Sequence, residues 1–367
     1  MIKLKLNFFI IFLCFCQWIN AYTQLSDEGF SILTNLTEIE AQKVAQDFLI
    51  PLLVPRVSGS EGNLKVQKYI IDHFQTLGWN VEEDKFTDST PIGEISFNNI
   101  IVTKDINAKN RLVLAVHYDS KYFEPPNDGF IGAIDSAVSC AILMDLAYRL
   151  DPYFDNRDPN SVSKTLQIIF FDGEEAFKDW TSTDSLYGSR HLATKWENTY
   201  VVDTGSTQNK GNNLLSGIEV FVLLDLLGAP EPYIPNFFPI TSWLFMELLE
   251  IEARLYKNKL IKFTQHKHKM IGMPVGDSLE DVTYFDTDSL QSYQAHIEDD
   301  YIPFLIRGVP VLHVIPWPFP DCWHKLSDNA TAVDHSVFFN LNNIFRIFTA
   351  EYLDIDPTLP KIKTKKN

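Results

Sequence analysis

The sequence runs Thr165-Leu166-Gln167-Ile168-Ile169-Phe170-Phe171-Asp172-Gly173-Glu174-Glu175, so that an apolar run ends abruptly on three carboxylates. The first seven residues are rich in β-branched and aromatic side chains, which predicts a strongly apolar strand over residues 165–171. In open α/β sheets, ligands bind just outside the carboxyl ends of the strands. This one stretch therefore predicts both a strand and the place where the chemistry occurs.

Strands and helices alternate on both sides of this stretch. Further strands are predicted at residues 79–86, 95–102, 111–116, 219–224 and 309–315, and helices at residues 66–77, 136–150, 241–255 and 337–353. Such alternation predicts an α/β fold with a central mixed, mostly parallel sheet flanked by helices. The polar stretches at residues 151–163 and 203–217 have the composition of surface loops, so residues 22–367 are expected to form a single globular domain.

The composition is consistent with one large domain. The chain has 367 residues, of which 45% are hydrophobic and 13% aromatic, enough for a large buried core. Its formal net charge of -17 argues against a nucleic-acid partner, because few basic groups are free to neutralise phosphates. The one basic cluster, Lys361 to Lys366, lies in a tail that starts at about residue 357 and is expected to be solvated.

The N-terminus has the pattern of a secretory signal peptide over residues 1–21. Lys3 and Lys5 precede the apolar run of residues 7–16, and Ala21 offers a small residue for cleavage. The run is too short for a comfortable membrane span of about 20 residues, although a retained anchor is the alternative interpretation. We expect a secreted monomer without stable membrane insertion after cleavage.

Two further features bear on secretion. The sequons at Asn35 and Asn329 are candidate glycosylation sites, as expected of a chain that passes through a secretory compartment. Beyond the signal segment only Cys140 and Cys322 remain, and the sequence alone does not show whether two such distant thiols meet.

Acidic and imidazole side chains directly follow several predicted strands. They are His117 and Asp119 after residues 111–116, Asp172, Glu174 and Glu175 after residues 165–171, and Asp225 after residues 219–224. Asp135 stands at the start of a predicted helix, and His324 lies in a late aromatic loop. Because independent strands deliver their carboxyl ends to one rim of the sheet, we expect these groups to lie close together.

Carboxylates that converge without nearby Lys or Arg repel one another and raise each other's pKa values, which a divalent cation would relieve. Mixed Asp, Glu and His ligands suit zinc, and three protein ligands would leave a fourth position open for catalysis. Glu174 and Glu175 are adjacent and cannot easily face one metal ion in the same way. The pair therefore favours one ligand and one acid–base group.

The strings around these groups resemble those of the zinc-aminopeptidase clan. They are Val116-His117-Tyr118-Asp119-Ser120, Asp135-Ser136-Ala137, Asp172-Gly173-Glu174-Glu175, Leu224-Asp225 and Trp323-His324. Longer strings resemble one branch of that clan, the animal glutaminyl-peptide cyclotransferases, at residues 51–60, 117–123, 171–177, 184–192, 223–230, 236–239 and within 299–315. The resemblance spans about residues 42–353, nearly the whole chain after the signal segment.

The resemblance implies an enzyme that cyclises N-terminal glutamine on peptides and proteins to pyroglutamate with release of ammonia. N-terminal glutamate is a second candidate substrate. One zinc ion per chain would be bound by Asp135, Glu175 and His324.

The resemblance also implies roles for the residues around the metal. Glu174 would carry protons, with Asp225 and Asp299 hydrogen-bonded around it. His117 and Ser136 would support the ligands without binding zinc. The pocket for the glutamine side chain would be lined by Trp180, Ile297, Phe319 and Trp323.

Two other functions remain open at this stage. A two-zinc aminopeptidase would keep Glu174 as general base and would take as ligands His117, Asp135, Glu175, Asp225 and His324. A catalytically weak secreted binding protein would keep the pocket without turnover. The cyclase-like strings outside the metal residues disfavour the peptidase.

The chain departs from the pattern of these relatives at two positions. Tyr301 stands where they usually have histidine before Ile-Pro-Phe, which changes the hydrogen bonding expected near Asp299. Val116 stands where secreted relatives have a cysteine able to bridge to the position of Cys140. Cys140 is therefore expected to be a free, buried thiol that packs as a small apolar side chain.

Overall fold

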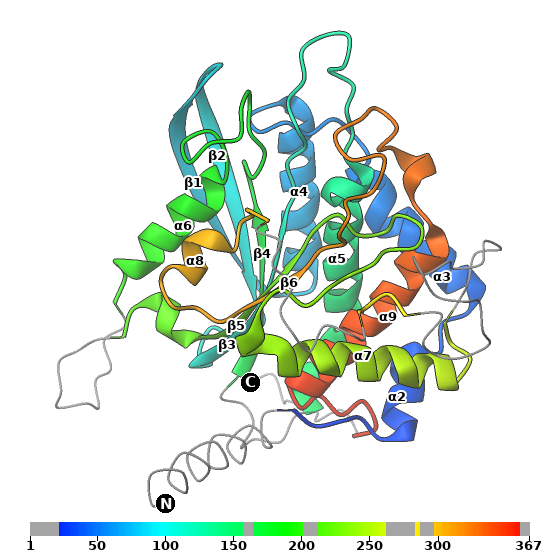
Figure 1. Ribbon diagram of the computed structural model, residues 1–367. Helices are drawn as coiled ribbons and strands as arrows, with labels where there is room; N and C mark the ends of the chain where they lie inside the picture. The colour runs from blue at the N-terminus through cyan, green and yellow to red at the C-terminus, as the bar shows by residue number, and fades with distance from the viewer. Residues whose placement is uncertain (1–21, 157–163, 201–211, 262–282, 287–296, 360–367) are drawn as a thin grey trace, which may run out of the picture.

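The computed structural model describes residues 22–156, 164–200, 212–261, 283–286 and 297–359, and its centre is a six-stranded sheet (Figure 1). The strands are β1 (Asn80–Thr90), β2 (Gly93–Thr103), β3 (Asn110–His117), β4 (Lys164–Phe171), β5 (Ile218–Leu224) and β6 (Val311–Val314), in the order β1-β2-β4-β3-β5-β6. The pairs β1–β2 and β2–β4 are antiparallel, whereas β4–β3, β3–β5 and β5–β6 are parallel. The predicted mixed, mostly parallel sheet is therefore confirmed.

Strand β4 has the interior position that its apolar sequence predicts. It lies between β2 and β3, and its side chains from Thr165 to Phe171 are all buried. The parallel strands end in register, with His117 opposite Phe171 and Leu224 opposite Val314. Because β3, β4, β5 and β6 run in the same direction, their carboxyl ends share one edge of the sheet, where ligands of such folds bind.

Helices cover both faces of the sheet (Figure 1). They are α2 (Asp27–Thr34), α3 (Glu38–Val44), α4 (Glu61–Thr76), α5 (Val138–Leu150), α6 (Tyr187–Glu197), α7 (Ser242–Lys257), α8 (Ile302–Leu305) and α9 (His335–Tyr352). Alternate side chains of β3 belong to different layers: Leu112 and Leu114 pack with α4, α5 and α9, whereas Val113 and Ala115 pack with α6 and α8. The chain thus forms a single three-layer α/β domain.

Most predicted elements lie within a few residues of those observed, and the exceptions have local causes. The helix predicted to start at Ser136 starts at Val138, because Ala133–Ala137 forms a wide π-type turn in which Asp135 and Ser136 leave helical geometry. Strand β6 is shorter than the predicted 309–315, since its pairing with β5 covers only Val311 to Val314. Helices α2, α3, α6 and α8 lie outside the predicted ranges, since none of them is long enough to carry a clear periodic pattern.

The free state predicted for Cys140 is confirmed. Cys140 is fully buried in α5 and forms no disulfide, and its Sγ donates to the backbone carbonyl of His117 at 3.3 Å. Cys322, which is half-buried, is also free.

The predicted signal peptide at residues 1–21 and the basic tail beyond residue 359 lie outside the described residues. Within the described part, no helix combines the length and the apolar character that a bilayer span needs. Of the two sequons, Asn35 is exposed, whereas Asn329 is half-buried and its side-chain amide donates to the carbonyl of Leu326 at 2.9 Å.

Helix α7 carries a buried acidic group on its inner face. Glu252 is 4% exposed, and one of its carboxylate oxygens accepts a hydrogen bond from the backbone N–H of Tyr284 at 2.7 Å. Burial raises the pKa of Glu252 from its ordinary value of 4.5 to about 8. Between these two values the folded protein holds a proton that the unfolded chain has released, so this group makes the fold less stable as pH rises.

We expect Glu252→Gln to remove this pH dependence while keeping the acceptor for Tyr284. In urea unfolding, the variant should be more stable than the wild type at pH 8, and its advantage should shrink by up to about 1.4 kcal/mol per pH unit as the pH falls towards 5. Glu250→Gln, at an exposed position of the same helix, is the matched control and should show no such trend. A stability difference for Glu252→Gln that does not change with pH would contradict this account.

Candidate metal centre and active site

Polar side chains gather at the shared carboxyl edge of the parallel strands. His117 is the last residue of β3, Glu174 and Glu175 lie in the loop after β4, and Asp225 follows β5 directly. Asp135 comes from the π-type turn before α5, and His324 from the loop between β6 and α9. All of these side chains except that of His324 are buried. The expectation that one rim of the sheet collects them is therefore confirmed.

Three of these side chains form a first group of potential metal ligands. Asp135, Glu175 and His324 each offer one ligand atom within 4.8 Å of the others. His324 Nε2 lies 3.1 Å from Glu175 Oε1 and 3.3 Å from Asp135 Oδ2. The structure thus brings together the three residues that the sequence analysis assigned to zinc.

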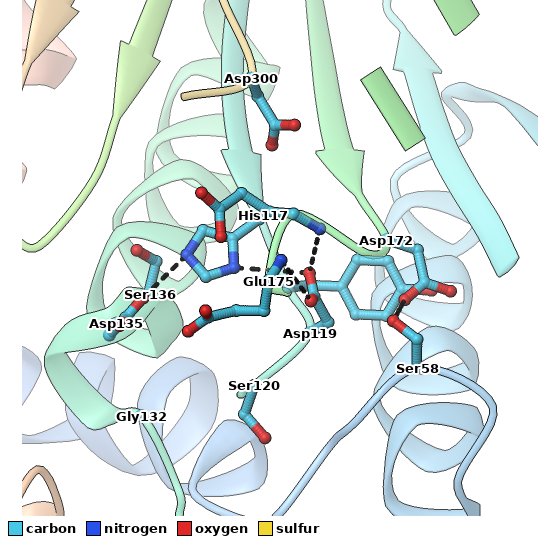
Figure 2. A network of polar contacts seen from close by, with 12 residues as sticks. Ser58, His117, Asp119, Ser120, Gly132, Asp135, Ser136, Asp172, Glu175 and Asp300 are labelled. Carbon is cyan, nitrogen blue, oxygen red and sulfur yellow. Dashed lines mark hydrogen bonds and ion pairs between the residues drawn. The ribbon is translucent and has the colours of Figure 1, made fainter. Parts of the chain in front are cut away.

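A second group shares Asp135 with the first. His117, Asp135 and Asp225 also offer ligand atoms within 4.8 Å of one another. Figure 2 shows the His117 ring between acidic side chains: its Nε2 lies 3.0 Å from Asp135 Oδ1, and its Nδ1 lies 3.4 Å from Asp119 Oδ1. Asp135 therefore faces His117 with one oxygen and His324 with the other.

Several atoms of these groups lack a hydrogen-bond partner although they are buried. They are both ring nitrogens of His117 and Oδ2 of Asp135, which have neighbouring polar atoms but no hydrogen bond of good geometry. Buried polar atoms in this state are rare in folded proteins, and a bound ion is one arrangement that accounts for them. A cation in the first group would satisfy Oδ2 of Asp135, and one in the second group would satisfy Nε2 of His117, whereas Nδ1 faces Asp119.

The electrostatics of the two histidines also fit a cation. Burial lowers the pKa of His324, but Glu175 and Asp135 outweigh this effect and raise it to about 9. Burial also lowers the pKa of His117, but Asp119, Asp135 and Asp225 outweigh it and raise this pKa well above its usual value. The carboxylates thus attract positive charge, which a metal ion could supply in place of the protons. Two carboxylates and one imidazole are a donor set that suits zinc.

The loop after β4 directs the two adjacent glutamates differently. Asp119 accepts the backbone N–H of Glu174 with Oδ1 and that of Glu175 with Oδ2, both at 3.2 Å. Lys121 Nζ donates to Glu175 Oε2 at 3.1 Å, which leaves Oε1 facing His324. Glu175 therefore belongs to the ligand group, and Glu174 does not.

Glu174 is surrounded by negative charge. Burial raises the pKa of its carboxyl group well above the usual value, and the charges of Glu175, Asp299 and Asp300 add to this, against an opposing effect of His117. Burial and Asp299 likewise raise the pKa of Asp300, which Figure 2 shows on the far side of His117 from Ser120. A carboxyl group in such surroundings can hold a proton near neutral pH.

The hydrogen bonds of Asp225 and Asp299 differ from those expected. The resemblance implies hydrogen bonds of both around Glu174, but Asp225 Oδ1 accepts from Ser136 Oγ and from the backbone N–H of Leu226, the latter at 2.8 Å. Asp299 Oδ2 accepts from His313 Nε2 at 2.7 Å. In the described residues Asp299 raises the pKa of Glu174 through its negative charge, while His313 occupies one of its oxygens.

The residues assigned to a substrate pocket appear as two pairs. The rings of Phe319 and Trp323 meet edge to face, with their centroids 4.8 Å apart. The ring of Trp323 stacks on that of His324, with a centroid distance of 4.1 Å. Trp180, which is 38% exposed, donates from Nε1 to Glu298 next to the buried Ile297. Exposed aromatic rings beside a buried polar centre are typical of a binding surface.

Tyr301 supports one side of this region. It is buried, and its hydroxyl group donates to the backbone carbonyl of Ile297 at 2.5 Å. Its ring also packs against that of His313, with the two ring centroids 4.8 Å apart. The tyrosine thus links the segment of Ile297 to the histidine that holds Asp299.

Sequence reasoning missed two residues of the site. His313 lies in the predicted strand 309–315, where a lone histidine in an apolar run was the available signal. Lys121 lies within the string 117–123 without a predicted role, although it is the cation that binds one oxygen of Glu175. Neither partnership can be derived from spacing, because each depends on how separate segments pack against one another.

Comparison with known proteins places this geometry in context. The model of peptidase family M28 matches residues 99–349. A glutaminyl-peptide cyclotransferase of Bos taurus is 44% identical over 316 residues, which cover 84% of this chain and 82% of that protein. One of Drosophila melanogaster is 40% identical over 333 residues, or 90% of this chain and 86% of that protein. The crystal structure of Macrostomum lignano glutaminyl cyclase superposes with a TM-score of 0.77 at 34% identity, covering 92% of this chain and 96% of that one.

The turn that presents Glu174 and Glu175 requires a glycine. Gly173 has a φ of +76°, and a Cβ there would lie 2.5 Å from the ring of Phe97. Gly78 has nearly the same φ, +73°, with nothing within 4 Å of the added atom. We expect Gly78→Ala to lower the free energy of unfolding by about 1–2 kcal/mol, through backbone strain alone. Gly173→Ala should lower it by about 1–3 kcal/mol more, because the added Cβ also overpacks against Phe97. Equal losses in urea unfolding would contradict this close packing.

Proposed function

Because the chain belongs to peptidase family M28 and, within it, to the glutaminyl-peptide cyclotransferases, we propose that it cyclises the N-terminal glutamine of peptides and proteins to pyroglutamate and releases ammonia. The observation that carries the proposal is the 40% and 44% identity to enzymes named for this reaction, over most of both chains. The site is consistent with it, since a group of mixed ligands lies beside a buried carboxyl group that is not one of them.

The proposed metal ligands are Asp135, Glu175 and His324, for one Zn²⁺ per chain. Lys121 occupies Oε2 of Glu175, so Oε1 is the oxygen available to the ion. When bound, the ion would supply Lewis-acid polarisation of the carbonyl of the substrate γ-carboxamide.

Glu174 is the proposed proton carrier. As a carboxylate it takes a proton from the substrate α-ammonium, so that the free amine attacks the γ-carboxamide carbon. A bond forms between the α-nitrogen and that carbon, and the bond from that carbon to the amide nitrogen breaks. Overall the α-nitrogen loses two protons and the departing nitrogen gains two, leaving as ammonium without consuming water. The raised pKa of Glu174 suits a group that must both accept and return a proton.

The surrounding residues would orient the substrate and keep Glu174 basic. We assign the aromatic pair Phe319 and Trp323, next to His324, to contact with the glutamine side chain, and Trp180 and Ile297 to the opposite side. Asp299, held by His313, would maintain the negative charge near Glu174. N-terminal glutamate is a second candidate substrate, and a catalytically weak binding protein is the alternative if turnover is absent.

A two-metal peptidase is the second candidate function, and two observations favour it: Nε2 of His117 is buried without a hydrogen bond, and a second ligand group contains it. His117, Asp135 and Asp225 form a second group of potential ligands. Asp225 Oδ1, the oxygen near His117, already accepts hydrogen bonds from Ser136 and Leu226. These donors compete with a metal for that oxygen, which is our reason to assign one ion and to give His117 and Ser136 supporting roles.

We also propose that the protein is a secreted monomer whose residues 1–21 are removed as a signal peptide. The charged and apolar pattern of that segment supports the proposal, as does the exposure of the sequon at Asn35. Asn329 remains a second candidate glycosylation site.

The number of ions separates the two candidate functions. We expect the purified protein to contain close to one zinc per chain by metal analysis, and His117→Asn to retain it. A reproducible value near two that falls to one in His117→Asn would instead support the peptidase.

The adjacent glutamates should give different phenotypes. Glu174→Gln keeps the size of the side chain but not its titrating proton, so turnover of a Gln-initiated peptide should fall about 10²–10⁴-fold while zinc stays bound. Glu175→Gln should instead weaken zinc retention, and added zinc should restore part of its activity. Near-normal turnover by Glu174→Gln, followed by ammonia release and peptide mass, would disprove the mechanism.

A further inference from the structure

A buried arginine outside the ligand groups touches the segment that carries Asp135. Arg56 is 0% exposed, and its guanidinium donates only to backbone carbonyls in its recorded hydrogen bonds. Arg56 lies between α3 and α4 in the chain, far from the ligands in sequence. Its contacts therefore join segments that nothing in the local sequence connects.

The guanidinium of Arg56 reaches three separate segments. Nε donates to Tyr118 O at 2.6 Å, just after β3, and Nη1 reaches Leu52 O at 3.4 Å and also Ile131 O. Nη2 donates to Gly132 O at 2.9 Å and to Asp135 O at 3.2 Å. The carbonyls of the loop at residues 131–135 thus converge on one planar, rigid donor, which a lysine cannot imitate.

The opposite side of the same loop is held by Asp328. This residue is buried, its Oδ1 accepts the backbone N–H of Ile134 at 2.7 Å, and its carbonyl accepts that of Ala133 at 3.4 Å. Asp328 lies in the same loop as His324, where its own N–H donates to Lys325 O at 2.8 Å. It therefore connects the segment of one proposed ligand to the segment of another.

We propose that Arg56 and Asp328 are positioning residues that hold the 131–135 loop from its two sides, and so set Asp135 at the distance from His324 that the metal requires. The inference rests on the metal site of the proposed function. Arg56 binds the carbonyls of the loop and Asp328 its N–H groups, so the backbone that carries Asp135 is satisfied within a turn that is not regular helix. Gly132 permits that turn, since its φ is +60° and an added Cβ would collide with Asp135 O.

The test measures metal binding rather than activity. Zn²⁺ affinity is determined by competition with a chromophoric chelator, and the Co²⁺-substituted protein is examined by visible absorption. We expect Arg56→Lys and Asp328→Ala each to weaken Zn²⁺ binding about 10–100-fold, as is typical when groups behind a ligand are lost, and to change the Co²⁺ spectrum. Asp328→Asn, which keeps an acceptor for Ile134, should recover most of the affinity lost in Asp328→Ala.

The matched control is Arg346→Lys. Arg346 is 1% exposed and also donates to a buried backbone carbonyl, Leu33 O at 2.8 Å, but it pairs with Asp145 and has no recorded contact with the 131–135 loop. This variant should lose stability in urea without a change in Zn²⁺ affinity or in the Co²⁺ spectrum. If Arg56→Lys does not fold, Asp328→Ala and Asp328→Asn test the same loop from its other side.

Two results would overturn the inference in different ways. Wild-type protein that binds Zn²⁺, with variants of Arg56 and Asp328 that bind it within about twofold and keep the Co²⁺ spectrum, would refute the positioning role and leave the proposed function intact. Wild-type protein that binds no Zn²⁺ would refute the proposed metal site itself, and this inference with it.

Discussion

Buried carboxylates at the carboxyl edge of the parallel strands repel one another, and much of the surrounding structure acts to contain that repulsion. Burial raises the pKa values of Glu174, Asp225 and Asp300, and neighbouring negative charge raises them further. The same carboxylates raise the pKa values of His117 and His324, so the imidazoles tend towards the charged form. A site of this kind demands positive charge at its centre. That demand connects the fold, which gathers the strand ends, to the chemistry, which needs an electrophilic metal.

Two neighbouring glutamates obtain different environments from the backbone. The N–H groups of Glu174 and Glu175 both bind Asp119, which fixes the turn, and Lys121 then occupies one oxygen of Glu175 only. Proton transfer and metal binding can therefore be divided between residues that differ little in intrinsic chemistry. The division depends on a turn with positive φ at Gly173, packed against Phe97, so the hydrophobic contact and the polar site are parts of one arrangement.

Two buried arginines show different ways of placing a cation in the core. Arg346 pairs with Asp145 at 2.6 Å, a buried ion pair between α9 and α5. The recorded hydrogen bonds of the Arg56 guanidinium go instead to backbone carbonyls, which leaves the nearby acidic groups free for other partners. Carbonyl dipoles stabilise this charge without consuming a carboxylate, and the carboxylates are what the metal centre needs. This arrangement suits a loop that must be both irregular and rigid.

The sequence by itself determined the fold class, which polar residues follow which strands, and the types of residue at the site. Apolar runs such as residues 165–171 identify strands because burial requires them, and acidic groups directly after a strand must lie at the sheet edge. The family resemblance indicated that Cys140 would be free, because Val116 replaces the expected partner cysteine, and it pointed to Asp135, Glu175 and His324 as one ligand set. Only the tertiary structure decided the partners: His313 for Asp299, Ser136 for Asp225, and Arg56 with Asp328 for the loop of Asp135. The local sequence pattern indicates which residues are buried and which form turns. Hydrogen bonds between separate segments depend on tertiary packing, which the spacing of residues in the sequence does not encode.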